Sequence, residues 1–180
     1  MTGDYVRVQW DKLVWNRLTV PKHRFFMWLI MLDRLQTSAR LCKYGISERA
    51  NCLICDREEE NQDHLIIQCK YSMAIWKMIM KWLQINSNHY TTDGMTRWLQ
   101  RCRASKFKRQ VYIAIMAAGV YHIWLTRNEV LWDKKVVSVD VLVNRIQRVV
   151  VDRVYSVIPK KINKSDREWL RIITQHVARR

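Results

Sequence analysis

Along most of the chain, apolar residues recur at the three- and four-residue spacing of amphipathic helices, and few turn-forming residues interrupt them. Only four glycines and two prolines occur among the 180 residues. This scarcity suits helices and disfavours a turn-rich β fold. The pattern therefore predicts a mainly α protein of about seven helices.

The first half of the chain is expected to form helices on both sides of a polar loop. Pro21 begins the first long helix, because the missing N–H of a proline costs nothing at the first helical position. Residues 25–32 are apolar on nearly every side, so we expect this helix at the centre of the core. Thr37 is expected to cap a short helix that stops at Gly45, and residues 71–83 form a helix after the loop.

The second half is expected to be helical almost throughout. Asp93 is a candidate cap for a short helix, and residues 107–132 form the longest apolar helix of the chain. Ser138 is expected to cap the helix that follows. Ser165 and Glu168 have the spacing of a capping box, in which each side chain satisfies a backbone N–H of the other residue. They are predicted to open the last helix.

Four potential metal ligands interrupt this helical pattern between residues 51 and 69. Cys52, Cys55, His64 and Cys69 have the spacing C-x2-C-x8-H-x4-C. A C-x2-C pair turns both sulfurs toward one point, and the histidine and last cysteine can complete a tetrahedron. Three thiolates and one imidazole leave no open position for water, which is typical of a structural zinc site. We therefore predict a helical domain built around a single Cys3His zinc knuckle with structural Zn²⁺.

The cysteines have two other possible roles. They could be small buried apolar residues, or a redox dithiol, although no βαβ pattern surrounds them. Residues 56–63 contain no apolar residue, so this loop cannot hold its ends together by burying itself, and a metal can. Cys42 is expected to be a core residue and not a ligand. His122, among apolar neighbours, is expected to be a core histidine with satisfied nitrogens.

The charge is strongly basic and unevenly distributed. The chain has a net charge of +16, from 32 basic and 16 acidic residues. Residues 1–95 hold 13 basic and 10 acidic residues, whereas residues 96–180 hold 19 and 6. A positive field of this size attracts polyanions, of which nucleic acid is the commonest inside cells. A solvated basic surface that faces an acidic protein is the alternative.

The residues predicted to bind nucleic acid form two groups. The first lies at the entry to the longest helix, and the second follows the solvent side of the helix after it: Arg101, Arg103, Lys106, Lys108 and Arg109, then Arg145, Arg148 and Arg153. Cations at a helix N-terminus oppose the helix dipole, which is a reason to suspect a phosphate there. The zinc loop is acidic and makes a poor phosphate contact. Contacts of this kind give affinity more than sequence choice.

Three groups of residues occur in a characteristic order along the chain. They are VPKHRFFMWL at 20–29 with RLQT at 34–37 and Leu41; Cys52, Cys55, Glu60, DHL at 63–65, Cys69, Tyr71 and Trp76; and IWLTRN at 123–128. This order resembles the plant zinc-binding domain found C-terminal to reverse transcriptase in non-LTR retrotransposons, over about residues 10–135. Asp56 stands where that family usually has glycine, and Asn61 where threonine is common.

The resemblance implies an accessory domain that is associated with nucleic acid and holds zinc through Cys52, Cys55, His64 and Cys69. No aspartate pair of the polymerase kind is present, and the six acidic residues after residue 95 are scattered over basic helices. No serine or cysteine stands beside a histidine base in a recognisable triad motif. We therefore expect that this chain is not an enzyme and that it has no catalytic residues and no small-molecule substrate.

The expected function is that of a zinc-stabilised nucleic-acid-binding module, with RNA favoured over DNA, from the C-terminal region of a retrotransposon reverse transcriptase. One alternative is a domesticated structural subunit of a larger ribonucleoprotein or protein assembly, and another is an interaction module that contacts no nucleic acid. Residues 1–92 would hold the N-terminal helices and the zinc loop, and residues 93–180 a basic helical region packed on them as one unit.

The location expected from the sequence is intracellular. The longest apolar run, residues 25–32, is far too short to span a bilayer, so no membrane association is expected. Reduced, metal-bound cysteines are typical of intracellular proteins. A nuclear location is expected, and a mitochondrial one stays open.

Overall fold

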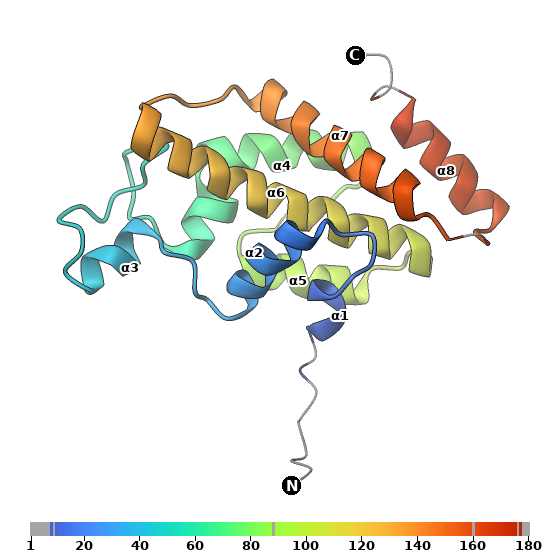
Figure 1. The fold of residues 1–180 in the computed structure, drawn as a ribbon, viewed down its shortest axis with the longest axis horizontal. Coiled ribbons are helices and arrows are strands. Elements are labelled where there is room, and N and C mark those ends of the chain that lie inside the picture. The colour runs from blue at the N-terminus through green and yellow to red at the C-terminus, as the bar shows by residue number, and fades with distance from the viewer. Residues whose placement is uncertain (1–7, 9, 88, 160, 176, 178–180) are drawn as a thin grey trace, which may run out of the picture.

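A computed structural model describes residues 8, 10–87, 89–159, 161–175 and 177 as a helical protein, which confirms the predicted fold class (Figure 1). In these residues the only β-type pairing outside the helices is a single antiparallel bridge between Asn51 and Glu59. The described elements, in chain order, are α1 (Asp11–Val14), α2 (Pro21–Met31), α3 (Ser38–Lys43), a π-helical turn η1 (His64–Gln68), α4 (Lys70–Leu83), α5 (Thr92–Arg101), α6 (Lys106–Asp133), α7 (Val139–Val157) and α8 (Lys164–Thr174). Among the described residues, no helix combines the length and apolar character that a membrane crossing requires.

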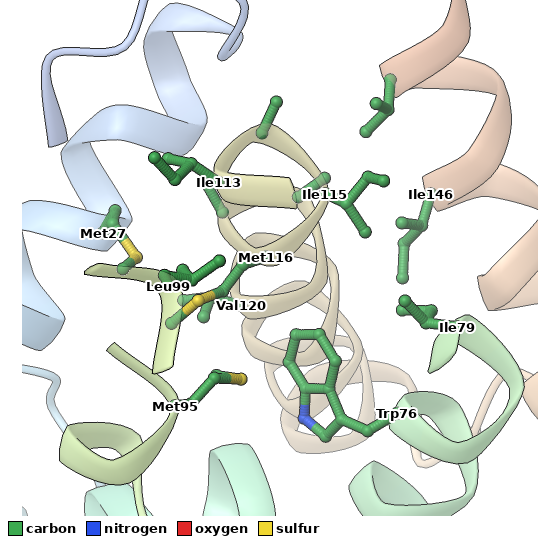
Figure 2. Packing of buried hydrophobic residues seen from close by; sticks show 14 of the residues in the cluster. Met27, Trp76, Ile79, Met95, Leu99, Ile113, Ile115, Met116, Val120 and Ile146 are labelled. Carbon is green, nitrogen blue, oxygen red and sulfur yellow. The ribbon is translucent and has the colours of Figure 1, made fainter. Parts of the chain in front are cut away.

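Helix α6 is the centre of the fold. Its middle section, residues 113–118, is buried on every side. Helices α2 and α7 pack along it, and η1, α4 and α5 complete the surround. Figure 2 shows this arrangement, with side chains of α2, α4, α5 and α7 pointing toward α6 from different directions. Elements from the first half of the chain therefore share one hydrophobic core with elements from the second.

Helix α2 begins at Pro21 as predicted, but it does not lie at the centre of the core. Of its residues only His23, Met27 and Ile30 are buried, and the Phe25 side chain is 52% exposed. The helix covers one side of α6, so an apolar stripe at helical spacing faces the core. The Phe26 ring also packs on α6, 5.3 Å from that of Tyr121, whereas Phe25 faces solvent. An apolar run on all sides was therefore a poor guide to which helix is central.

Three of the predicted helix starts and stops are confirmed. The Thr37 side chain accepts a hydrogen bond from the N–H of Arg40, and Gly45 takes a left-handed backbone after α3. The Ser138 side chain accepts from the N–H of Val141 at the start of α7. Local capping chemistry was sufficient at these positions because each cap stands next to its own helix.

The other two predicted caps are wrong. Thr91, and not Asp93, caps α5, by accepting the N–H of Gly94 at 3.0 Å. Asn163 caps α8 by accepting the N–H of Asp166 at 2.7 Å. Residues 165 and 168 lie inside that helix, so they form no capping box. In each case the cap is a polar residue two positions earlier, which accepts a free backbone N–H, so the helix is longer than predicted by part of a turn.

Candidate metal centre

The four predicted zinc ligands lie together. Cys52, Cys55, His64 and Cys69 place their ligand atoms within 4.8 Å of one another, and three of these residues are buried. The Sγ atoms of Cys52 and Cys69 are 3.9 Å apart, and Cys55 Sγ lies 3.4 Å from His64 Nε2. Tetrahedral zinc with Zn–S bonds of about 2.3 Å requires S···S edges of roughly 3.8 Å and S···N edges of roughly 3.6 Å. The donor set and its spacing therefore fit a zinc ion.

The first two ligands are held by a tight, hydrogen-bonded turn. The N–H of Asp56 donates to the carbonyl of Cys52 at 2.8 Å, and the N–H of Cys52 donates to the carbonyl of Glu58 at 2.8 Å. Asp56 has a left-handed backbone with φ of +52°. Glycine adopts that conformation without strain, whereas aspartate tolerates it at a modest cost. The residue that departs from the family pattern thus stands where glycine has a physical reason to occur.

The last two ligands are brought together by the π-helical turn. The N–H of Cys69 donates to the carbonyl of His64 at 2.6 Å, five residues earlier. Along an ordinary α-helix, five residues would separate two side chains by about 140° around the axis. The wider π turn reduces this separation, so both ligands face the cysteine pair. Its start is fixed by Asn61, whose side-chain oxygen accepts the N–H of His64 at 2.8 Å.

Hydrogen bonding and charge inside the cluster prepare it for a cation. The hydrogen bond between Cys52 and Cys69, together with burial, raises the pKa of the Cys52 thiol, and the same hydrogen bond lowers the pKa of Cys69. A bound metal replaces the thiol protons. Glu58 Oε2 lies 3.3 Å from His64 Nδ1, without hydrogen-bond geometry. A carboxylate on that side favours a proton on Nδ1 and leaves Nε2 free as the ligand atom.

A buried ion pair anchors the loop to the central helix, and residue spacing alone does not indicate this pairing. Glu60 in the zinc loop and Arg127 in α6 are 0% and 3% exposed, and their charged atoms meet at 2.9 Å. Glu60 also accepts the N–H and the hydroxyl of Ser38 at 2.8 and 2.9 Å, and the N–H of Leu53 at 3.1 Å. One carboxylate thus joins the metal loop, the start of α3 and the core.

Two further loop residues hold neighbouring helices. The Gln62 side chain donates to the carbonyl of Ile30 at the end of α2, at 3.2 Å. Asp63 accepts both the N–H and the hydroxyl of Thr92, at 2.8 and 2.6 Å, and so fixes the start of α5. A metal was expected to hold this polar loop, and the structure shows that polar side chains anchor it as well. Polar side chains can anchor a loop when the surrounding fold supplies their partners.

Residues 1–76 match the family described as zinc-binding in reverse transcriptase. The matched range contains all four ligands of the cluster, and the description names zinc binding and not the catalytic part of that enzyme. No curated protein and no solved structure matched the chain. The cluster is thus a candidate zinc centre on both geometric and family grounds.

Arg127 and α6 lie outside the range that matches the zinc-binding family. The resemblance placed Glu60 in the second group of residues and the IWLTRN string, which contains Arg127, in the third, without indicating a contact. The structure shows that these two parts of the pattern meet in one ion pair. The signal was therefore present in the sequence as two separate strings, but only the fold brings them together.

The first basic group lies at the end of the molecule where α6 begins, away from α3 and its following loop (Figure 1). Arg101, Arg103 and Lys106 are exposed. Lys108 is half-buried, and its Nζ lies 5.4 Å from the centroid of the Trp169 ring. Arg109 is also half-buried and donates to the carbonyl of residue 102 at 3.0 Å. No observation tests whether these five residues bind nucleic acid, so that stays a prediction.

The second basic group is only partly available to a ligand. Arg145 and Arg148 are exposed on α7. Arg153 is half-buried and donates to the carbonyl of Arg17 at 3.0 Å, which also accepts from Arg24 at 3.2 Å. Burial and then the nearby Arg153 guanidinium lower the pKa of Arg24. Their role in binding nucleic acid is likewise untested.

The start of α6 already has an anion near it. Ser105 caps the helix by accepting the N–H of Lys108, and its hydroxyl donates to Asp166 at 2.8 Å. Asp166 comes from α8 and is 3% exposed. The helix dipole therefore meets a carboxylate of the same chain. The helix dipole is therefore no longer an argument for a bound phosphate at this helix start. The exposed positive charge beside the helix start is the argument that remains.

The remaining cysteine and histidine predictions have different outcomes. Cys42 is half-buried on α3 and is not part of the four-ligand cluster. His122 packs its ring against Tyr121 and lies 5.7 Å from the ring of His23. Neither nitrogen of either histidine has a hydrogen-bond partner, so the expectation of satisfied nitrogens is wrong. Burial lowers the pKa of His23 to about 3 and that of His122 to about 4, so both rings are neutral at pH 7.

Proposed function

We propose that the chain is a non-catalytic, zinc-stabilised nucleic-acid-binding module that favours RNA over DNA and belongs to the C-terminal region of a reverse transcriptase. The observation that carries the zinc part is the closed set of three thiols and one imidazole within 4.8 Å. Four protein ligands leave no position for a reacting water, so the metal would stabilise the fold without taking part in a reaction.

The zinc would be held by Cys52, Cys55, His64 and Cys69, and it would fasten the turn at residues 52–56 to η1. The energy of such a bond set contributes directly to folding. The chain's own residues do the rest of the positioning, because Glu60 joins the loop to α3 and α6. The metal centre is therefore proposed as a structural clamp beside the core.

The nucleic-acid part rests on charge. Arg101 at the end of α5, Arg103 in the connection and Lys106 at the start of α6 are exposed, and none of them forms an ion pair within the described part of the chain. Unpaired exposed cations make favourable phosphate contacts because binding releases counterions from the nucleic acid. Such contacts are independent of base sequence.

The test neutralises Arg103, Lys106 and Lys108 together by substitution with alanine, and measures RNA affinity against salt concentration. We expect weaker binding and a slope of log K against log salt that is less steep by about two to three. The matched control neutralises Lys43, Arg49 and Arg57, three exposed cations on α3 and in the segments that follow it. An unchanged slope in the first variant would remove this surface from the proposal.

A structural subunit of a larger assembly is the second candidate, and exposed aromatic residues favour it. Trp15, Trp132 and Phe25 are 64%, 78% and 52% exposed. Large exposed apolar side chains often mark protein contacts. Co-purification of an intact complex from native cells would support this candidate, whereas a free protein that binds short oligonucleotides would support the first.

A further inference from the structure

A cavity of about 690 Å³ lies between η1, α4 and the connection from α4 to α5. Its lining is mostly apolar and includes Trp76, Met73, Met80 and Met95, of which Trp76 and Met95 are buried and Met73 is exposed. Trp76 is fixed there because its ring N–H donates to the carbonyl of Ile66 at 2.7 Å. The cavity is large enough for a small planar group and is distinct from the metal cluster.

The mouth of this cavity is positively charged. Lys77 and Lys81 line it, both are exposed, and they stand one turn apart on the same face of α4. No acidic residue is among those that line the cavity, and neither lysine forms an ion pair in the described part of the chain. An apolar interior behind two free ammonium groups suits a ligand with a flat apolar part and an anionic backbone.

Aromatic rings continue from the mouth toward the first basic group. Tyr90 lines the mouth and is 76% exposed. Next to it, the His89 ring lies 5.3 Å from that of Trp98, and Trp98 stacks on Tyr112 at 5.9 Å. The centroid of the Tyr112 ring lies 5.7 Å from that of Trp169, and the Lys108 ammonium lies over the Trp169 ring. Half-buried rings interleaved with lysines are typical of proteins that bind single strands by stacking.

We propose that this cavity receives a base of a single-stranded nucleic acid, with Lys77 and Lys81 on the adjoining phosphates and Tyr90 stacked at the mouth. The inference rests on the proposed function and adds to it a site and a preference for unpaired strands. A duplex keeps its bases stacked inside the helix, so it cannot place one in the cavity. An apolar peptide would fill the interior but would leave both lysines without a partner.

The site is linked to the metal centre through one hydrogen bond. Gln68, the last residue of η1, donates from its side chain to the carbonyl of Tyr90 at 2.9 Å. That turn also carries the ligands His64 and, directly after it, Cys69. Loss of the metal should therefore loosen the mouth of the cavity and weaken binding of single strands.

The experiment measures fluorescence anisotropy of a labelled single-stranded oligouridine of about 12 nucleotides, and of a duplex RNA of the same length. Tyr90→Ala removes the exposed ring and keeps the backbone carbonyl, and Ala74→Trp fills the cavity from α4. Each is expected to lower affinity for the single strand by about tenfold, without changing the salt slope or duplex binding. Tyr44→Ala, at a 61% exposed tyrosine at the end of α3, is the matched control.

Different outcomes separate this inference from the proposed function. If Tyr90→Ala binds the single strand as the parent does, while neutralising the first basic group still weakens binding, the cavity assignment is wrong and the module remains. If the parent protein binds neither the single-stranded nor the duplex RNA, the cavity assignment and the proposed function are both wrong. Quenching of tryptophan fluorescence by an acidic apolar peptide, with no response to oligouridine, would assign the cavity to a protein partner and overturn the inference. Tyr90→Ala keeps the test valid should Ala74→Trp fail to fold.

Discussion

Replacing Arg127 with methionine is expected to destabilise the protein strongly, because it leaves a buried carboxylate without its counter-charge. In the native structure the Arg127 guanidinium contacts Glu60 at 2.9 Å and donates to the Ser38 hydroxyl at 3.1 Å. The charged side chains of this pair are 4% and 0% exposed. Methionine has a similar length and no charge, so the change removes the ion pair with little loss of apolar packing.

The magnitude follows from burial. Breaking a buried pair by removing one partner costs about 3–5 kcal/mol. Glu60 retains hydrogen bonds from two backbone N–H groups, those of Ser38 and Leu53, and from the Ser38 hydroxyl. These bonds partly stabilise the remaining charge, so we expect the lower end, about 3 kcal/mol. For a chain of this length that corresponds to a fall in Tm of roughly 6–12 °C.

The assay is thermal and urea denaturation of the zinc-loaded protein, followed by far-UV circular dichroism. The matched control is Arg97→Met on α5, where Arg97 meets Asp93 at 2.8 Å with side chains 59% and 70% exposed. Because this pair has a similar distance but lies in solvent, its loss should cost no more than about 0.5 kcal/mol. Adding Glu60→Gln to Arg127→Met should recover part of the loss, since the unpaired charge is then gone.

A free energy of unfolding for Arg127→Met within about 1 kcal/mol of the parent would refute the reasoning. It would mean that water or another cation reaches Glu60, and that burial in the native fold does not determine the strength of this pair. Equal losses in Arg127→Met and in the exposed control would lead to the same conclusion.

Three other changes test separate parts of the structure. Cys55→Ser should abolish stoichiometric zinc binding, measured by elemental analysis, and reduce helicity near the loop, because the binding energy of a four-ligand zinc site contributes to folding. In the folded protein the pKa values of His23 and His122 are lowered to about 3 and about 4, so the unfolded chain binds protons first as the pH falls. The free energy of unfolding should therefore be highest above about pH 6.5 and decrease at lower pH. The decrease is at most about 1.4 kcal/mol per pH unit for each histidine. Gly119→Ala should lower Tm in a thermal melt by an amount that corresponds to about 1–3 kcal/mol, because the added methyl group would overlap the Trp76 indole.

Each of these changes has its own contrary result. Cys42→Ser, at a half-buried cysteine outside the cluster, should keep full zinc content, and loss of zinc there would question the ligand assignment. The acid effect is measured on metal-free protein, so that acid-induced release of a metal does not contribute. A flat profile between pH 4 and pH 6.5 would contradict buried, neutral imidazoles. An unchanged melting temperature in Gly119→Ala would show that the indole can move aside.

The sequence was sufficient where the physical cause is local. The spacing of Cys52, Cys55, His64 and Cys69 predicted the cluster because ligand geometry restricts spacing. Helix periodicity predicted the long apolar helix to within a residue or two at each end. It could not show which helix is central, because an apolar run on all sides describes both a buried helix and one with an exposed aromatic face.

Features that depend on distant contacts were not predictable from one sequence. The partner of Glu60 lies 67 positions away, and the carboxylate near the start of α6 comes from a residue 61 positions later. Loop acids such as Glu60 and Asp63 look like solvated charge in sequence, since burial of a charge requires a partner that only the fold supplies. The incorrect caps have a smaller cause, because several polar residues near a helix start compete for the same N–H groups.

The distribution of anchors in the zinc loop changes what the metal is needed for. Glu60, Gln62 and Asp63 hold the loop to α3, α6, α2 and α5 through bonds that involve no ligand atom. The core around α6 is formed by apolar packing that likewise does not involve the cluster. Zinc binding energy therefore acts mainly between the turn at residues 52–56 and η1, which the Cys52–Cys69 and Cys55–His64 pairs join directly. Because η1 also borders the proposed base site, the physical consequence of metal loss would be local disorder at a binding surface, with the helical core retained.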